Sequence, residues 1–233
     1  RAQGYAQGHW MYQFIVSSFG AGAPLALMDR YALGDREEAA FGRVLGVDRA
    51  GFMERFKGWA REDLVRVGMI EPESVPSVNG LLAKEDAGEG GAAPEPTIAM
   101  AERWLEAYPG HAGVLGLLVS LELSAREQEA DAGMIGLLER YALARPVDPL
   151  PHKLLAAIYL DGQAGSKHEA IEHLEYLDAR EQRSPAYAAE LARRYAAGGD
   201  WSRAWAKARR ATGIAPFDAA ARELAATVAL MRG

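Results

Sequence analysis

The chain has 233 residues, of which 49% are apolar and 25% are charged, and its formal net charge at pH 7 is −6. This length and apolar content allow one or two domains with a sizeable core. The excess of negative charge argues against nucleic acid as a partner, because phosphate binding requires clustered positive charge. The absence of cysteine excludes disulfides and thiolate metal sites, and no uninterrupted apolar run of ~18 residues is present to span a membrane.

Four short helices are predicted in the first part of the chain. The apolar stretch 5–18 is followed by a glycine-rich turn, and a second helix begins at Pro24, a residue that suits the first turn, and ends at Gly34. Asp35 and Asp48 are the predicted N-caps of the third and fourth helices. The buried face of the fourth helix is predicted from aromatic residues at spacings of four and three, Phe52, Phe56 and Trp59.

Residues 70–96 lack helical periodicity and are rich in proline, glycine and Asn79-Gly80, which is the chemistry of turns and linkers. We therefore predict a linker here, between a helical domain at 1–69 and a second domain at 97–233. The glycines of this stretch do not make a phosphate-binding signature, because no strand precedes them and no Lys-Ser/Thr follows.

Proline-punctuated helical segments fill the rest of the chain. Pro109, Pro146 and Pro216 occupy one shared position, which predicts that a helix ends at the residue before each, because proline cannot extend the helix that precedes it. Ala170 and Ala204 are 34 residues apart and are predicted where two helices cross closely. A final helix is predicted from Asp218, an aspartate suited to N-capping.

From Pro185 the sequence resembles a tetratricopeptide repeat, and the unit that begins at Pro149 has similar spacing. The residues that match the repeat's first helix are Leu155, Ala156 and Tyr159 in one unit, and Ala188, Leu191, Ala192 and Tyr195 in the next. The resemblance implies an all-α fold, with a right-handed solenoid of about three helix pairs and a capping helix after the N-terminal helical domain. A non-repetitive helical bundle is the alternative, because alanine-rich helices also match loose repeat patterns.

In tetratricopeptide domains the first helix of each unit lines a concave groove that binds a protein or peptide partner. Carried over by position, the residues that line this groove are small, mostly apolar and sparsely charged. Lys153 and Arg193 are the predicted binding residues, because each cation could hold a peptide carboxylate or acidic side chain; Asp161 and Ser120 lie on the same predicted face. The alternatives are that the cations are simply solvated, or that the groove packs on the N-terminal domain or another copy.

A second resemblance begins at Gly4-Tyr5-Ala-Gln-Gly8. A Tyr-x-x-Gly that opens an apolar helix is similar to a segment of aminopeptidase N-like zinc peptidases, and more similar to the bacterial peptidase-MA-like (gluzincin) domains. The order of short helices through residue 66 resembles the end of that domain, which is often followed by tetratricopeptide repeats. By this resemblance Tyr5 matches the tyrosine whose hydroxyl donates a hydrogen bond to the oxyanion of the tetrahedral intermediate. An ordinary core or terminal tyrosine is the alternative.

The chain departs from those peptidases at the metal site, because no HExxH is present. His168 and His173 are five residues apart, a separation that rotates them by ~140° around a helix and away from a common ion. We therefore expect no catalysis, no metal ligands and no cofactor in this chain, with zinc expected only if an upstream HExxH domain exists.

Two hypotheses follow. In one, the chain is the non-catalytic C-terminal part of a gluzincin-like metallopeptidase that carries a protein-interaction scaffold. In the other, it is a free-standing tetratricopeptide adaptor with no enzymatic role. The sequence ahead of Arg1 would discriminate between them. No recognisable motif in the sequence identifies the partner, the oligomeric state or the cellular compartment, and none indicates whether the protein is exported.

Overall fold

The structure, a computed structural model, describes residues 2–85, 94–162 and 169–232, and for residues 2–7 it describes the backbone alone. Every regular element in these ranges is a helix, so the predicted all-α class is confirmed. The chain divides after Ile70 into two compact units. Each unit has its own buried core and is described by itself.

The first unit contains the four predicted helices, α1 (Ala2–Phe19), α2 (Ala23–Ala32), α3 (Glu37–Val44) and α4 (Arg49–Arg66). Its core is largely aromatic. The ring of Phe14 on α1 lies 5.3 Å from that of Phe52 and 5.7 Å from that of Trp59, measured between centroids. Phe52 and Phe56 are both buried, which confirms the predicted inner face of α4.

Of the two N-caps predicted in this unit, Asp48 is confirmed and Asp35 is wrong. Asp48 caps α4 by accepting a hydrogen bond from the backbone N–H of Gly51 at 2.7 Å. The prediction for Asp35 is wrong, since the N-cap of α3 is Arg36, which makes no side-chain capping bond. The Asp35 carboxylate instead forms ion pairs with Arg30 and Arg43 on either side of it. Two guanidinium groups thus hold the carboxylate that the sequence assigns to the helix end.

Helix α2 leaves large apolar side chains in contact with solvent. Leu25 and Met28 of α2 are 65% and 66% exposed, and Leu33, the C-cap of the helix, is 73% exposed. No single helix in the described ranges is long and apolar enough to cross a membrane. The segment of α1 from Gly8, taken together with α2 across a bend of 109°, does reach that length and apolar content.

Part of the predicted linker at 70–96 is folded. It contains α5 (Val78–Glu85), whose Leu81 is buried in the core of the second unit. The linker prediction is therefore wrong for this part, because contacts with residues distant in sequence, which local periodicity does not reveal, order it. The glycine-rich residues 86–93 lie outside the described ranges.

His111 fixes the chain that leads into α5. It is 3% exposed, and its two ring nitrogens face two oxygens: Nε2 lies 2.9 Å from the carbonyl oxygen of Pro76, and Nδ1 lies 2.8 Å from Oε1 of Glu71. The same Glu71 oxygen accepts a hydrogen bond from the backbone N–H of Gly113 at 3.1 Å. These contacts attach the segment from Glu71 onward to the second unit.

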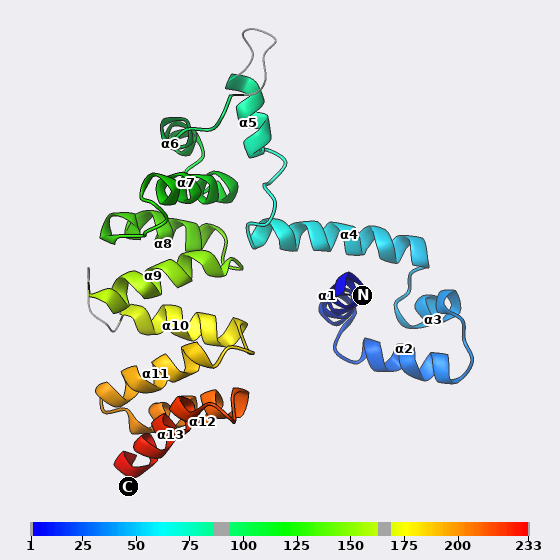
Figure 1. Ribbon diagram of the computed structural model, residues 1–233. Helices are drawn as coiled ribbons and strands as arrows, with labels where there is room; N and C mark the ends of the chain where they lie inside the picture. The colour runs from blue at the N-terminus through cyan, green and yellow to red at the C-terminus, as the bar shows by residue number, and fades with distance from the viewer. Residues whose placement is uncertain (1, 86–93, 163–168, 233) are drawn as a thin grey trace. The chain divides into compact units, whose positions relative to one another are not determined.

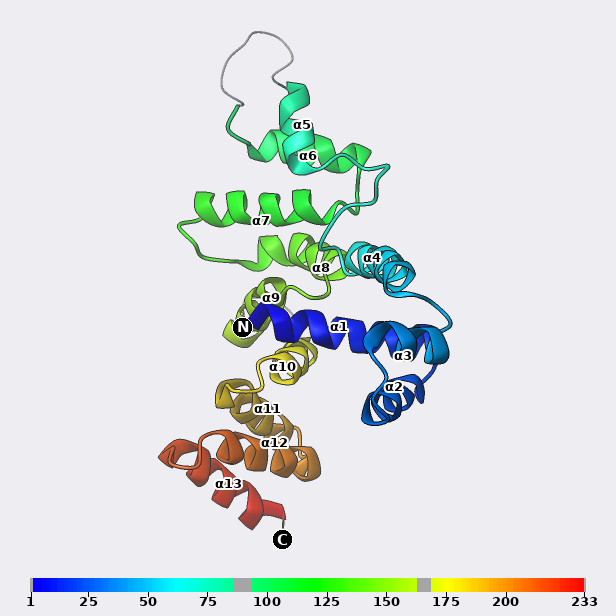
Figure 2. The same cartoon turned by 90° about the vertical axis from the view of Figure 1, so that its right-hand side faces the viewer.

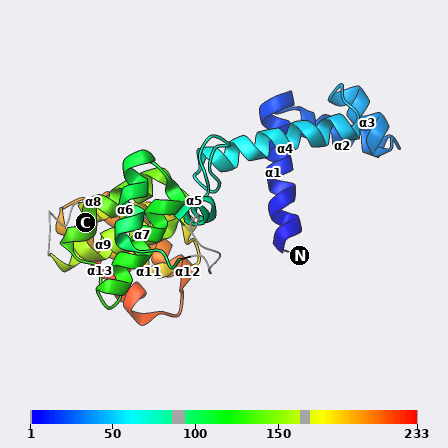
Figure 3. The same ribbon diagram turned by 90° about the horizontal axis from the view of Figure 1, so that it is seen from above.

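The second unit is a stack of helices that follow one another in chain order (Figures 1 and 2). After α5 come α6 (Ile98–Ala107), α7 (Ala112–Ala125), the 3-10 turn η1 (Ala132–Met134) with α8 (Ile135–Ala144), α9 (Pro149–Asp161), α10 (Glu169–Arg180), α11 (Pro185–Ala197), α12 (Trp201–Ile214) and α13 (Ala219–Arg232). Consecutive helices from α6 onward pack on each other, and they overlap when viewed along the stack in Figure 3. We call α7, α9 and α11 the A helices, and α8, α10 and α12 the B helices. Three A–B pairs therefore stand between the flanking helices α6 and α13.

The same turn follows α6, α8 and α12. Its C-cap residue has φ of −133°, −132° and −126° and ψ of 72°, 74° and 72° at Tyr108, Arg145 and Ala215, respectively. Each of these residues precedes proline, which disfavours the helical region for the residue before it. The C-cap carbonyl accepts a hydrogen bond at 3.0–3.1 Å from the residue three positions later, which is His111, Asp148 or Asp218. The predicted helix ends are confirmed, and each turn leads directly into the next cap.

Small side chains occupy two of the three corresponding helix crossings. Ala170 of α10 and Ala204 of α12 are 0% exposed, and Met134 fills the corresponding place in the first pair at 1% exposed. Ala208 and Ala211, farther along α12, are also 0% exposed. The two alanines that the sequence places at helix crossings are therefore buried as predicted.

Equivalent tyrosines connect successive pairs. Tyr159 of α9 donates a hydrogen bond to Glu139 of α8 at 3.4 Å, and Tyr195 of α11 donates one to Glu175 of α10 at 2.8 Å. Each bond joins an A helix to the B helix of the preceding pair. The contact recurs because the two tyrosines occupy the same position of the helix-pair pattern.

An ion network ties α12 to α10. Asp178 of α10 is 2% exposed and accepts hydrogen bonds from Lys207 Nζ and Arg210 Nε, both at 2.8 Å. Burial opposes the charge on Lys207, but its hydrogen bonds to Asp178 and Glu175 outweigh that effect and raise the Lys207 pKa. The network satisfies a carboxylate that would otherwise be costly to bury.

Candidate functional site

The A helices present one set of exposed positions again and again. Nine residues after their respective N-caps, α7, α9 and α11 expose Ser120, Ala157 and Arg193. Because stacked repeats place equivalent positions on the same side, these residues belong to one face, which we call the A-helix face. Its other members are Leu150 and Ala186 at one position, and Lys153 and Ala189 at another. The equivalent residues of α7 are Gly113 and Gly116, which are packed against Val78 and Tyr141, respectively.

Lys153, one of the two predicted binding cations, already has an intramolecular partner. Its Nζ lies 2.5 Å from Oε1 of Glu181, which is the residue that follows α10. The hydrogen bond to Glu181 raises the Lys153 pKa, so the side chain is charged at neutral pH. A ligand carboxylate at this position would have to share Lys153 with Glu181.

Arg193, the second predicted cation, is also paired. Its Nη1 lies 3.0 Å from Oε2 of Glu190, three residues earlier on α11, and half of the Arg193 side chain stays exposed. Glu190 at the same time binds Arg194. The A-helix face therefore carries cations, but each of them has a carboxylate from its own chain beside it.

Ser120 and Asp161 are exposed on two successive A helices. Ser120 lies on α7, where its backbone carbonyl accepts a hydrogen bond from the Ser124 hydroxyl at 2.9 Å. Asp161 ends α9 and, with Ala157 one turn earlier, lines a hollow of about 380 Å³. Ala130, from the loop that precedes η1, lines the same hollow. The A-helix face is thus indented beside α9.

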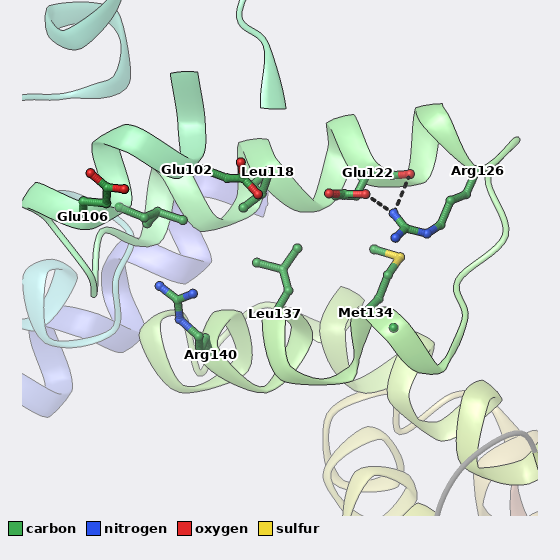
Figure 4. Close-up of a pocket in the computed structure, with 10 residues that line it drawn as sticks. Glu102, Glu106, Leu118, Glu122, Arg126, Met134, Leu137 and Arg140 are labelled. Carbon is green, nitrogen blue, oxygen red and sulfur yellow. Dashed lines mark hydrogen bonds and ion pairs between the residues drawn. The ribbon is translucent and has the colours of Figure 1, made fainter. Parts of the chain in front are cut away.

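A second hollow, of about 500 Å³, lies among α6, α7 and the η1–α8 segment (Figure 4). Its floor is apolar, with Leu105, Leu118 and Met134 buried. Its rim carries charges of both signs, namely Glu102, Glu106, Glu122, Arg126 and Arg140. Glu122 and Arg126 pair with each other, and the remaining rim charges include both signs, so the rim does not favour ligands of one charge.

The first B helix begins with a 3-10 turn at one side of the Figure 4 hollow. Gly133 and Met134 of this turn, η1, line the hollow. The loop before η1 contains Glu127 and Gln128 with φ of 55° and 71°, a left-handed conformation that is uncommon for residues other than glycine. This irregular loop distinguishes the first pair from the third.

Two histidines meet between the helices of the middle pair. Nδ1 of His152 on α9 lies 3.0 Å from Nδ1 of His173 on α10. The ring of Tyr176 stacks on His152 at 3.7 Å between centroids, and the ring of Tyr159 lies parallel to His173 at 5.8 Å. Tyr176 is itself fixed by a 2.6 Å hydrogen bond from its hydroxyl to the carbonyl of Pro146. The two imidazoles are therefore held in place from both sides.

The environment keeps these imidazoles neutral at pH 7. Burial, reinforced by the neighbouring His173, lowers the pKa of His152 to about 4. Burial also lowers the pKa of His173, against the opposing effect of Glu172. A close contact between two neutral rings requires that one Nδ1 carries a proton and the other accepts it.

The residues expected from the peptidase resemblance offer no described site. The Tyr5 side chain and the whole of His168 lie outside the described part of the molecule. Within that part, no group of three or more His, Asp or Glu side chains could hold a metal ion. The catalytic role of Tyr5 therefore stays a prediction from sequence.

Sequence patterns pointed to the A-helix face but not to the Figure 4 hollow or the histidine pair. His152 is the fourth residue of α9, a position that the sequence pattern assigns to the core, and its partner comes from the next helix. No protein-family model matches this chain, and no curated protein is significantly similar to it.

Proposed function

We propose that the second unit is a scaffold that binds an extended segment of a partner protein across its A helices, as tetratricopeptide domains do. The observation that supports this most is the recurrence of exposed positions on three successive A helices, at Ser120, Ala157 and Arg193. A helical stack that repeats a surface position builds an elongated binding face, and a linear segment can follow it from unit to unit.

The small side chains of the A-helix face favour this kind of ligand. Ala157 and Ala186 are exposed and have no side-chain rotamers to lose, so a bound segment can approach the helices closely at little cost in conformational entropy. The pairs of Lys153 with Glu181 and of Arg193 with Glu190 do not block the face. Exposed pairs contribute only about 0.2–1 kcal/mol, so an acidic ligand group can take over either cation at small cost.

Selection of peptides followed by matched substitutions tests this proposal. Peptides are selected from a displayed random library against the immobilised 233-residue chain, and their affinities are measured with the variants Ala157→Arg and Ala206→Arg. Both alanines are exposed on helices, Ala157 on the A-helix face of α9 and Ala206 on the B helix α12. We expect Ala157→Arg to weaken binding by at least ~10-fold, or about 1.4 kcal/mol, and Ala206→Arg to leave it unchanged.

A third variant distinguishes the two hollows. Glu102→Lys reverses a charge on the rim of the Figure 4 hollow and leaves the A-helix face intact. If the selected peptides lose affinity with Glu102→Lys and keep it with Ala157→Arg, the binding surface lies on α6 and α8, and the proposal is wrong. Failure to select any peptide that binds in solution would also count against it.

We propose separately that the first unit is related to the end of a gluzincin-like domain, so that the chain is the non-catalytic C-terminal part of a larger peptidase. This rests on the resemblance of residues 4–66 and is compatible with the order of α1 to α4. A gene that encodes HExxH ahead of Arg1 would support it. A complete reading frame without that motif would leave the free-standing adaptor.

A further inference from the structure

We propose that His152 and His173 bind one divalent transition-metal ion, of the class of Zn²⁺ or Ni²⁺, through their two Nδ1 atoms. The ion would clamp α9 to α10 in the middle of the stack. This goes beyond the scaffold function, and it differs from the expectation that the chain carries no metal ligands. That expectation rests on His168 and His173, which share a helix in the sequence pattern, whereas His152 comes from the helix before.

The distance between the nitrogens fits a shared ion. With metal–nitrogen bonds of about 2.0–2.1 Å, two ligands at a right angle lie about 2.9 Å apart, and two ligands at the tetrahedral angle lie about 3.3 Å apart. The Nδ1 atoms of His152 and His173 are 3.0 Å apart, between these two values. Entry of an ion therefore requires the nitrogens to move by only a few tenths of an ångström, together with a rotation of the rings that turns both Nδ1 lone pairs from each other towards the ion.

The protonation state also suits a metal. Metal ions bind an unprotonated ring nitrogen, and the 3.0 Å contact between the two Nδ1 atoms requires that one of them is unprotonated. One Nδ1 already presents a lone pair to the other. When an ion replaces the shared hydrogen, the donor ring moves its proton from Nδ1 to Nε2, so both nitrogens coordinate without any net release of protons.

The position of His152 indicates that packing alone does not require a histidine there. The corresponding residues of the first and third A helices are Leu115 and Ala188, which are 1% and 0% exposed. An apolar side chain therefore fits this place in the other pairs. The histidine places a nitrogen ligand at a position where the other two A helices have a buried apolar side chain.

The ion would keep open coordination positions. The described residues offer no third protein ligand beside His152 and His173, so water completes the shell. Imidazole nitrogen is a preferred ligand of zinc, copper and nickel. A site with two protein ligands binds an exchangeable ion, in contrast to structural zinc sites, which are closed by four protein ligands.

Calorimetric titration of the untagged 233-residue chain with ZnCl₂ and NiCl₂ tests the proposal, with ¹⁵N spectra of the imidazole rings as a second readout. The variants are His152→Leu, which copies the leucine at the same place in α7, and His173→Gln. The matched control is His9→Gln, because His9 is exposed on α1 in the first unit. Circular dichroism establishes that each variant is folded.

We expect one saturable ion per chain, shifts of both Nδ1 resonances on binding, and at least a ~10-fold loss of affinity in either variant but not in the control. The metal should also raise the unfolding temperature of the wild-type chain and not that of His173→Gln. Three results would each overturn the site: no saturable binding up to ~1 mM metal, binding that survives in both variants, or loss of binding in His9→Gln. Should His152→Leu fail to fold, His173→Gln decides the matter alone.

Discussion

Enlarging one buried alanine on α12 should destabilise the second unit, while the same change two residues away should not. Ala204 is 0% exposed where α12 packs on α11, whereas Ala206 on the same helix is exposed. Leucine adds three carbon atoms to either site. In open space within a core these carbons would stabilise by about 0.8 kcal/mol each, but a filled crossing must move apart to admit them, which costs about 1–3 kcal/mol.

We therefore expect Ala204→Leu to lower the free energy of unfolding by about 2 kcal/mol, and Ala206→Leu to change it by less than ~0.5 kcal/mol. The difference in intrinsic helix propensity between alanine and leucine is the same at both sites, so the comparison isolates packing. Urea denaturation followed by circular dichroism gives the free energies, and hydrogen exchange of the α11 and α12 amides localises the loss. Equal stability of the two variants would refute the close helix crossing.

Three further predictions concern single side chains. Asp178→Asn should lower the free energy of unfolding, measured by urea denaturation, by about 2–3 kcal/mol. This is less than the usual loss for a broken buried ion pair, because Lys207 keeps Glu175 as a partner. A loss under ~0.5 kcal/mol would contradict the network. Burial and then the hydrogen bond to Asp148 raise the pKa of Tyr141 to about 12, so its contribution to stability is present below the unfolded-state value near 10 and disappears as the pH rises towards 12. Ultraviolet absorbance should show a tyrosine titrating near pH 12 that Tyr141→Phe removes, and persistence of that phase would exclude the assignment. Asp48→Ala should destabilise the first unit by about 1 kcal/mol while Asp48→Asn retains most of the cap, and equal losses in the two would argue against capping.

Much of the fold could be predicted because its boundaries depend on local chemistry. Proline after Tyr108, Arg145 and Ala215 disfavours the helical conformation at the residue before it, and all three helices have their C-caps at these residues. Buried alanines at Ala170 and Ala204 are likewise dictated by the approach of neighbouring helices. Such features depend on residues a few positions apart, which a sequence displays directly.

The failures of prediction come from contacts between distant residues. Helix α5 lies in a stretch whose sequence looks like a linker. The chain before it is held in place because Glu71 and the carbonyl of Pro76 contact His111, which is 35 or more residues away. Asp35 looks like a cap because the sequence does not show that two arginines converge on it. No local pattern encodes these choices.

For the candidate site, the exposure of the side chains could be predicted from the sequence, but their ion-pair partners could not. The exposed positions of the A-helix face follow from helical spacing, and Ser120, Lys153, Asp161 and Arg193 are all exposed as expected. The partner of Lys153, however, is Glu181, which follows the B helix of the same pair, so the contact spans 28 residues. The meeting of His152 with His173 also depends on how α9 and α10 pack, so periodicity could not reveal it.

Binding of a partner segment by the A-helix face is tested most directly by amide chemical-shift mapping with a library-selected peptide. We predict that the perturbed amides cluster on α7, α9 and α11 around Ser120, Ala157 and Arg193. Perturbations confined to α6 and α8 around the Figure 4 hollow, or to the first unit, would contradict the proposal.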